Sequence, residues 1–169
     1  MKLAVLSDIH DQLGNLNKAL EKIKKEGIKY AIFCGDYCAS ETFHIATRNF
    51  QKAYCVWGNV DGDRFKITQK VYEQKTGNVI LLDQLGEIEI EQRRIAVIHY
   101  DNIGERLAQS THYDAVFHGH THMARNEKVG GTLLVNPGPV CGYKKGKIVP
   151  ATYGIYDTNN NSAKIISIK

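Results

Sequence analysis

Short apolar runs and longer amphipathic segments alternate along the first third of the chain. Three of the runs have the length of buried strands, and each ends in a polar residue: 2–7, 30–36 and 53–59. The two segments between them, 15–26 and 41–50, carry apolar residues at helical spacing, and Asn15 and Gly27 stand where a cap and a stop are expected. The order strand, helix, strand, helix, strand predicts a parallel sheet.

The rest of the chain is richer in strands than in helices. Seven segments predict strands: 78–83, 86–92, 93–100, 115–120, 132–138, 151–157 and 162–169. Isoleucine and glutamate alternate over residues 87–91, so we expect the stretch 86–100 to be a hairpin with one buried face. Only residues 102–110 predict a helix. Two mixed sheets with helices outside accommodate this pattern, which belongs to the α/β class.

Length and composition indicate one globular domain over residues 1–169. The chain has no internal repeat and no linker, and 43% of its residues are hydrophobic and 24% charged. No apolar run approaches the roughly 18 residues of a membrane span, and the N-terminus lacks the pattern of a signal peptide. We therefore expect a cytoplasmic protein without a membrane partner, with four free cysteines. Cys34 and Cys38 would begin a zinc knuckle only if a second close pair followed, and none does.

Residues with metal-ligand chemistry follow five of the predicted strands. They are Asp8 and His10, then Asp36, then Asn59, then His99, and finally His120 and His122. Because the carboxyl ends of parallel strands meet at one crevice, these side chains are expected to lie close together. Carboxylate and amide oxygens and imidazole nitrogens are the ligands that divalent transition metals accept.

The local spacing within these motifs supports a metal site. On an extended strand, residues two apart share a face, so Asp8 and His10 are expected to point at one ion, and His120 and His122 are expected to face the same side. Each motif alone also has an ordinary explanation as a cap, a turn or a buried histidine. The order of all five along the chain is what points to a shared metal centre.

This ordered set resembles the motifs of the calcineurin-like metallophosphoesterases, and in particular their small single-domain phosphodiesterases from bacteria and archaea. The matching segments are SDIHD at 7–11, CGDY at 34–37, GNVD at 58–61, IHYDN at 98–102, HGHTH at 118–122 and NPG at 136–138. The resemblance implies a four-layer α-β-β-α sandwich of two mixed sheets flanked by helices.

The resemblance also implies two divalent cations. One would bind Asp8, His10, Asp36 and His122, and the second would bind Asp36, Asn59, His99 and His120. Asp36 would bridge them, and a shared carboxylate offsets the repulsion between the two cations. Manganese is the first choice, and nickel, iron, cobalt or zinc would suit the same ligands.

The activity implied is hydrolysis of a phosphate ester, in the first place a diester, by attack of a hydroxide that bridges the two metals. Five residues are expected to be catalytic: Asp8, His10, Asp36, Asn59 and His99. Asn59 and Tyr100 are expected to contact the substrate. Two ions, two carboxylates and one hydroxide leave a single positive charge in excess, which attracts a phosphate ester without an arginine clamp.

The sequence departs from larger relatives at Val60, where they carry a histidine that protonates the leaving group. Valine has no proton to give, so we expect a preference for activated leaving groups, since general acid catalysis is worth about 10²–10⁴-fold.

His118 matches no ligand position and is expected to pack beside the site. The loop 136–138 is either a plain turn or a support for the site.

Two other functions stay open at this point. A eukaryotic retromer subunit has the same fold and acts as a protein-interaction scaffold with a degraded metal site, whereas this chain keeps every ligand. A nuclease is the other alternative, but the net charge of +4 without a basic and aromatic track does not favour binding of nucleic acid. A small-molecule phosphate ester is the expected partner, and the oligomeric state is open, with a homodimer as one outcome.

Overall fold

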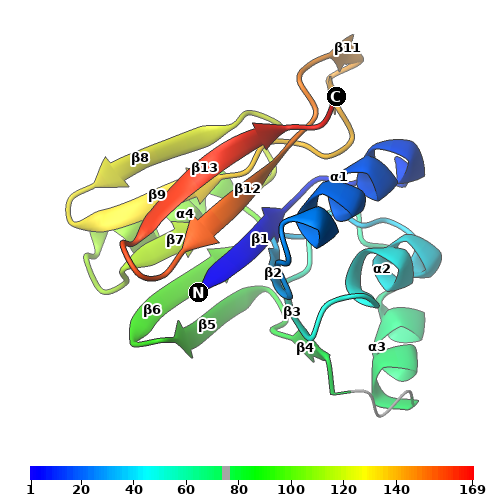
Figure 1. Ribbon diagram of the computed structural model, residues 1–169, viewed down its shortest axis with the longest axis horizontal. Helices are drawn as coiled ribbons and strands as arrows, with labels where there is room; N and C mark the ends of the chain where they lie inside the picture. Colours follow the sequence, from blue (N-terminus) through cyan, green and yellow to red (C-terminus); the bar gives the residue numbers. More distant parts are fainter. Residues whose placement is uncertain (74–76) are drawn as a thin grey trace.

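Two mixed β-sheets form the body of the protein (Figure 1). The computed structural model describes residues 1–73 and 77–169. The first sheet has the strand order β13 (Ser162–Ser167), β12 (Thr152–Asp157), β1 (Lys2–Leu6), β2 (Tyr30–Phe33), β3 (Lys52–Cys55) and β4 (Val79–Leu81). The second has the order β5 (Leu85–Ile90), β6 (Arg93–Ile98), β7 (Ala115–Phe117), β9 (Thr132–Asn136) and β8 (Arg125–Val129). Strands β1 to β3 are parallel, as the sequence predicted, and β4 continues the parallel order.

Helices cover the outer faces of the sheets. The helices α1 (Leu13–Lys25), α2 (Ser40–Thr47) and α3 (Arg64–Glu73) lie together on one side of the molecule, and α4 (Asp101–Gln109) packs against β6, β7 and β9 (Figure 1). The predicted four-layer α-β-β-α arrangement is confirmed. None of the helices in the described part of the chain is long and apolar enough to cross a membrane.

Separate apolar cores hold the layers together. Alternate residues of β1 supply two of them, because side chains along a strand point to opposite faces. Leu3 and Val5 lie in the core between the two sheets, whereas Ala4 and Leu6 lie in the core beneath the helices. A strand that is buried on both faces carries apolar residues without alternation. This explains why the segment 2–7 contains one unbroken apolar run after its first residue.

The predicted hairpin is confirmed as β5 and β6. Ile88 and Ile90 pack into the core between the sheets, while the glutamates between and beside them stay exposed. The turn residues Glu91 and Gln92 have φ values of 48° and 65°, which is the left-handed pair that a two-residue hairpin loop requires.

Helix α1 differs from the prediction at its N-terminus. It begins at Leu13, so Asn15 lies inside the first turn and is not the cap. The Asn15 amide instead donates hydrogen bonds to the carbonyls of Val140 and Cys141, at 3.1 and 3.2 Å. The predicted stop is confirmed, because Gly27 has a φ of 68° and its N–H bonds back to the carbonyl of Lys24.

Three further elements were not expected from the sequence. Helix α3 buries only Ile67, and β8 buries none of its side chains, so neither has the apolar periodicity that marks an element. A two-stranded ribbon, β10 (Tyr143–Lys144) and β11 (Lys147–Ile148), projects beyond the sheets (Figure 1). Its strands are too short for any alternation to be recognised.

Candidate metal centre

The residues that follow the strand ends turn sharply as soon as the strands stop. Five of the predicted ligands have positive φ angles between 46° and 70°: Asp8, His10, Asp36, His120 and His122. The expectation that Asp8 with His10 and His120 with His122 share the face of an extended strand is therefore wrong. These side chains converge because the backbone is held in a left-handed conformation, which is uncommon for residues other than glycine and clusters at functional sites.

Backbone hydrogen bonds between the loops hold this conformation. The amides of Ile9 and His10 both donate to the carbonyl of Asp36, at 2.9 and 3.1 Å, and the amide of Asp8 donates to the carbonyl of Gly35 at 3.1 Å. The loop after β1 is thereby attached to the loop after β2 at the point where both carry ligand residues.

Glycines allow the loops of the site to approach one another closely. A Cβ atom on Gly35 would lie 2.5 Å from the amide nitrogen of Gly58, and one on Gly58 would lie 2.1 Å from an oxygen of Asp36. Gly119 is restricted in the same way, since its Cβ would lie 1.9 Å from the hydroxyl of Ser7. A side chain at any of these positions would push two loops of the site apart.

Asp61 organises the loops after β2 and β3, and sequence reasoning gave it no role of its own. Its buried carboxylate accepts four backbone N–H groups at 2.6–3.0 Å, from Asp36, Tyr37, Cys38 and Gly58. The only signal in the sequence was its place in the segment GNVD. A carboxylate with this many donors has no lone pair left to orient a histidine at the neighbouring position.

One half of the site gathers Asp8, His10, Asp36 and His122. The Nε2 atoms of His10 and His122 lie 3.1 Å apart. Nε2 of His10 lies 3.4 Å from Oδ2 of Asp36, and Nε2 of His122 lies 3.4 Å from Oδ1 of Asp8. One ligand atom from each of the four residues can be chosen so that all lie within 4.8 Å of one another.

The other half gathers Asn59, His99 and His120 around the same Asp36. Oδ1 of Asn59 lies 2.9 Å from Nε2 of His99 and 2.9 Å from Nδ1 of His120. The two imidazole nitrogens lie 3.3 Å apart, and Nε2 of His99 lies 3.3 Å from Oδ2 of Asp36. Oδ2 of Asp36 therefore faces both halves of the site.

These spacings fit divalent cations. Ligands about 2.0–2.2 Å from an ion stand roughly 3.0–3.4 Å apart in octahedral or tetrahedral geometry, which is the range observed between the facing atoms. Oδ2 of Asp8 is buried and has no hydrogen-bond partner in the described part of the chain. A buried carboxylate oxygen without a donor is costly unless a cation satisfies it.

Two of the histidines are oriented through their second ring nitrogen. Nδ1–H of His99 donates to the carbonyl of Cys34 at 2.8 Å, and Nδ1–H of His122 donates to the carbonyl of Tyr143. Each bond fixes the tautomer with Nε2 free, so that Nε2 points its lone pair into the site.

The carboxyl groups of the site differ in their proton affinity. Burial raises the pKa of Asp8. Burial acts in the same direction on Asp36, but the hydrogen bond and the charge of His99 outweigh it, and the pKa of Asp36 is lowered. Burial would lower the pKa of His99, yet the hydrogen bond and the charge of Asp36 raise it. Without a bound cation, the Asp36–His99 pair thus favours an ionised carboxylate beside a protonated imidazole.

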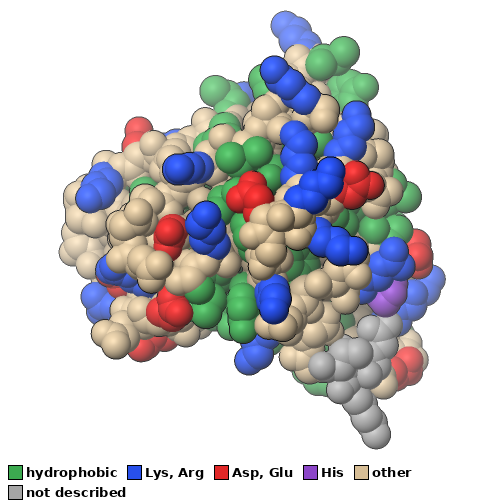
Figure 2. All heavy atoms as spheres, in the orientation of Figure 1, with side chains coloured by type: hydrophobic (Ala, Val, Ile, Leu, Met, Phe, Trp, Pro, Cys, Tyr) green, Lys and Arg blue, Asp and Glu red, His purple; other side chains and the backbone are tan. Residues whose placement is uncertain are grey.

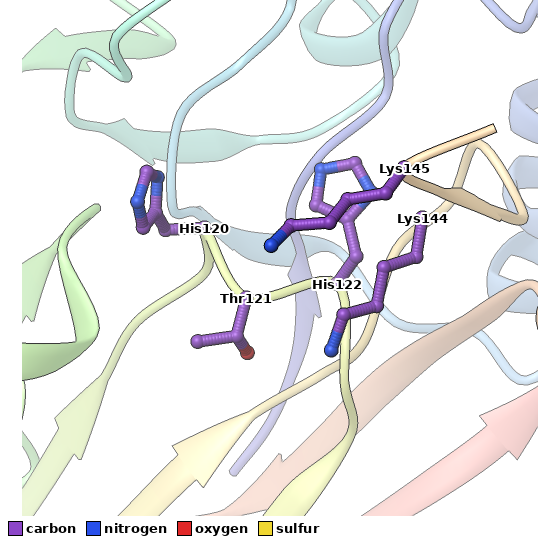
Figure 3. Close-up of a pocket in the computed structure, with 5 residues that line it drawn as sticks. All are labelled: His120, Thr121, His122, Lys144 and Lys145. Carbon is purple, nitrogen blue, oxygen red and sulfur yellow. The ribbon is translucent and has the colours of Figure 1, made fainter.

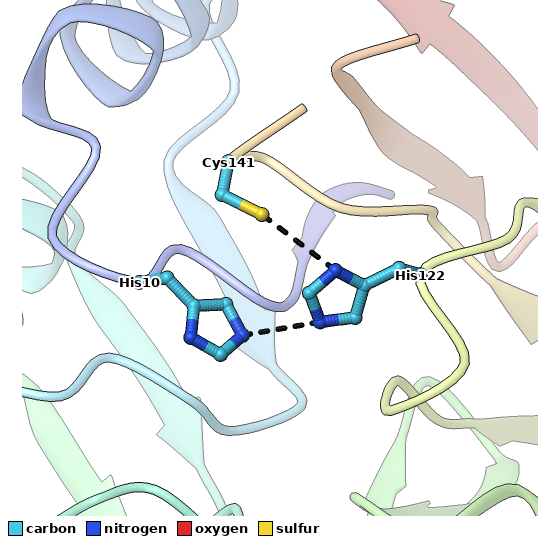
Figure 4. A group of neighbouring side chains, drawn as sticks. All are labelled: His10, His122 and Cys141. Atoms are coloured by element: carbon cyan, nitrogen blue, oxygen red, sulfur yellow. Dashed lines mark hydrogen bonds between the residues drawn. The ribbon is translucent and has the colours of Figure 1, made fainter. Parts of the chain in front are cut away.

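Cys141 lies against the site but on its outer side. Its Sγ is 3.7 Å from Nδ1 of His122, the ring nitrogen that faces away from His10 (Figure 4). The Nδ1–H of His122 is shared between the Cys141 sulfur and the Tyr143 carbonyl, and these two acceptors raise the pKa of His122 to about 9 despite its burial. The thiol therefore supports His122 rather than joining the set of nitrogen and oxygen atoms.

Tyr100 and Val60 lie at the edge of the site. The ring of Tyr100 packs against those of His99 and His120, with centroids 5.4 and 5.3 Å apart. The backbone N–H of Val60 donates to Oδ1 of Asp36 at 3.0 Å, and its side chain is 41% exposed. Val60 thus combines a structural backbone contact with an inert side chain beside the site.

His118 and Asn136 lie behind the site. His118 is buried against Gly104 of α4, 1% exposed, and its ring is not among the converging atoms. The Asn136 amide donates to the carbonyl of Gly119 at 2.8 Å and to the hydroxyl of Thr121 at 3.1 Å. The loop that begins at Asn136 therefore braces the segment that carries His120 and His122.

Sequence comparison matches residues 1–161 to the calcineurin-like phosphoesterase superfamily domain. Phosphodiesterase MJ0936 of Methanocaldococcus jannaschii is 32% identical to this chain over 171 residues, a match that spans the whole of both proteins. Phosphodiesterase YfcE of Escherichia coli is 25% identical over 173 residues, which span 94% of this chain and 89% of that protein.

Solved structures agree with these matches. The structure of an archaeal phosphodiesterase superposes with a TM-score of 0.84 at 31% identity and covers 99% of each chain. Vps29 of Entamoeba histolytica, solved in complex with zinc, superposes with a TM-score of 0.70 over the full length of both chains. At 17% identity this superposition shows a shared fold alone.

Proposed function

Because the chain belongs to the calcineurin-like phosphoesterase superfamily, we propose that it is a metal-dependent phosphodiesterase whose site binds two divalent cations. The observation that carries the proposal is the convergence of seven side chains in two sets that share Oδ2 of Asp36. Two relatives with the name phosphodiesterase match the chain over most or all of its length.

The ligand sets follow from the two halves of the site. The first cation binds Asp8, His10, Asp36 and His122, and the second binds Asp36, Asn59, His99 and His120. Nitrogen and oxygen ligands suit manganese first, and nickel, iron, cobalt or zinc as well. The position of Asp36 Oδ2, 3.4 Å from Nε2 of His10 and 3.3 Å from Nε2 of His99, supports its role as the shared ligand.

Two divalent cations bound there would lower the pKa of a water between them and neutralise charge on the phosphoryl oxygens. The chain supplies two negative charges to the site, from Asp8 and Asp36, while the histidines and Asn59 are neutral ligands. This composition keeps the site positive and attractive to a phosphate ester. With Oδ1 of Asn59 turned toward His99 and His120, its amide N–H₂ group is left to donate to the substrate.

The leaving group receives no proton from the position after Asn59. Val60 carries no acidic hydrogen, and the carboxylate of Asp61 is occupied by backbone amides. We therefore propose that the enzyme prefers diesters with good leaving groups, or substrates that supply a proton themselves, because general acid help is absent.

The test is hydrolysis of bis-p-nitrophenyl phosphate by protein that has been stripped with chelator and reloaded with manganese, nickel, iron, cobalt or zinc. We expect turnover with at least one metal, faster than that of p-nitrophenyl phosphate, and two metal ions per chain by elemental mass spectrometry. Asp36→Ala is the matched negative control and should lose both activity and metal. A folded wild-type protein that is inactive with every metal would contradict the proposal.

A protein-interaction scaffold is the second candidate, because Vps29 shares the fold and one of its structures contains zinc. The complete ligand set of this chain supports the enzyme over the scaffold. The same assay separates them, since a scaffold would bind metal without turnover. A nuclease would instead cleave oligonucleotides faster than small diesters.

We also propose that residues 1–169 form one domain, which is supported by the apolar core that both sheets share. The four free cysteines support a cytoplasmic location, where thiols stay reduced. A homodimer remains a prediction that light scattering would check.

A further inference from the structure

The ribbon β10–β11 is a tight hairpin of defined geometry. Tyr143 pairs with Ile148 and Lys144 with Lys147, and the connecting residues Lys145 and Gly146 have φ values of 47° and 75°. A two-residue loop with two positive φ angles is the turn that matches the twist of a β-hairpin. Basic and apolar side chains surround the hairpin on the face of the molecule shown in Figure 2.

This hairpin is attached to the metal centre. The carbonyl of Tyr143 accepts the Nδ1–H of His122, and the amide of Cys141 donates to the carbonyl of Asp8 at 3.0 Å. Lys144 follows directly after the carbonyl that orients a ligand histidine. The hairpin and the site therefore keep a set distance from one another, although the hairpin belongs to neither sheet.

A pocket of about 360 Å³ lies between the hairpin and the site. It is lined by His120, Thr121, His122, Lys144 and Lys145. Figure 3 shows both lysine side chains extending from the hairpin toward the segment that carries the two histidines. One wall of the pocket thus holds ligand residues of both halves of the site, and the other holds two ammonium groups.

The positive charge of the hairpin is not neutralised within the protein. Across residues 1–73 and 77–169, neither Lys144 nor Lys145 forms an ion pair with a carboxylate. The segment 115–156 contains a single acidic residue, Glu127, which pairs with Arg125. Lys144 also stands directly opposite Lys147 across the hairpin, an arrangement of like charges that destabilises a strand pair.

We propose that Lys144 and Lys145 bind a second anionic group of the substrate, so that the preferred substrate is a phosphodiester that also carries a phosphate or carboxylate. The inference rests on the proposed phosphodiesterase function. Two divalent cations and one hydroxide, held by Asp8 and Asp36, would leave the site with about one positive charge in excess, which would match the single charge of a diester. The two ammonium groups add two further positive charges next to it, which an uncharged substituent would leave unpaired.

The first experiment compares three p-nitrophenyl diesters that share the reacting phosphorus and the leaving group. Their second ester arm is an uncharged alkyl chain, a chain ending in a carboxylate, or a chain ending in a phosphate monoester. We expect kcat/KM to be about tenfold or more higher for a charged arm, mainly through a lower KM, because each charge-assisted hydrogen bond is strong. The carboxylate and phosphate arms show which anion the lysines prefer.

Variants of the hairpin distinguish direct binding of the anionic arm by the two lysines from a long-range attraction by the charge of the hairpin. Lys144→Gln/Lys145→Gln should lower the ratio of kcat/KM for charged over uncharged diesters by about tenfold. Lys144→Arg/Lys145→Arg keeps both positive charges and should retain most of the wild-type ratio. Lys147→Gln removes one charge from the same hairpin but from a side chain that does not line the pocket, and should keep the ratio within about twofold.

A binding measurement avoids turnover altogether. Calorimetry with methylenediphosphonate and methylphosphonate on the metal-loaded protein should give a ratio of affinities that falls about tenfold in the double glutamine variant and stays unchanged in Lys147→Gln. If wild type hydrolyses the uncharged diester but gains nothing from a second anion, the lysine inference is overturned and the proposed function stands. If no diester is hydrolysed under any metal, the proposed function itself is overturned.

Discussion

The metal centre and the hairpin beside it are built in opposite ways. Asp8, Asp36 and His99 are at most 2% exposed and lie at the ends of strands that the cores hold from both faces. The hairpin has strands of two residues each, and Tyr143 and Ile148 are 48% and 84% exposed. The ligand atoms of the metal centre must converge, and they lie where packing fixes their positions. The residues proposed to select the substrate lie on a surface hairpin, where substitutions are better tolerated.

Loss of a ligand side chain from the metal centre should have the largest effect. We expect His122→Ala to lower kcat/KM by about 10³-fold and to lose at least one metal ion per chain. His118→Asn, two positions from His120 but buried against α4, should keep both ions and activity within about tenfold. Elemental mass spectrometry and diester hydrolysis check this pair. Equal loss of metal in both variants would contradict the assignment of His118 as a residue that binds no cation.

Removal of Asp61 should show how strongly buried hydrogen bonds hold the metal centre. Asp61→Ala leaves four backbone amides without their acceptor, and we expect the free energy of unfolding to fall by about 4 kcal/mol. Glu21→Ala removes an exposed carboxylate from α1 and is the control. It should change the free energy of unfolding by less than about 0.5 kcal/mol. Urea unfolding monitored by circular dichroism measures both. A loss below about 1 kcal/mol in Asp61→Ala would mean that the loops do not depend on this carboxylate.

Val60 is an exposed side chain at the edge of the metal centre, so a substitution there should alter the chemistry without disturbing the buried ligands. In wild type, rates on aryl diesters should fall steeply as the pKa of the leaving phenol rises. Val60→His should flatten this dependence and raise the rate on the poorest leaving groups by about 10–100-fold, since a general acid becomes available. Steady-state kinetics on a series of substituted phenyl diesters gives the slope. The idea fails if the wild-type rate is independent of the leaving group.

The smallest effect concerns two buried histidines with opposite shifts, in protein freed of metal by chelator. Burial lowers the pKa of His118, so its contribution to stability is lost as the pH falls below about 6.5, its ordinary value. The pKa of His99 is raised by Asp36, so its contribution is present below about 6.5 and is lost as the pH rises through the shifted value. Urea unfolding from pH 5 to 9 should therefore show a smaller acid-side loss in His118→Asn and a smaller alkaline-side loss in His99→Asn. Parallel curves for wild type and both variants would rule out this assignment.

Much of this structure was predictable from the pattern of the chain. Leu3 to Leu6, Ala31 to Phe33 and Val116 to Phe117 are buried, so their apolar runs predicted strands. The Asp and His residues that follow within a few positions of each run predicted which loops carry ligands. Elements with few buried residues were missed, because α3 buries Ile67 alone and β8 buries nothing. Hydrophobic periodicity arises from burial of one face of an element, so it cannot predict an element that stays at the surface.

The sequence by itself determined which side chains have ligand chemistry and that strand ends would bring them together, because both follow from residue type and from the direction of parallel strands. Only the tertiary structure decided how they converge. The left-handed backbone at Asp8 and His10 is held by hydrogen bonds to the carbonyls of Gly35 and Asp36, in a loop that is far away in sequence. The four amides that bind Asp61 and the two lysines beside the histidines were also placed by the tertiary structure. A local sequence pattern does not predict which distant segment a side chain will face.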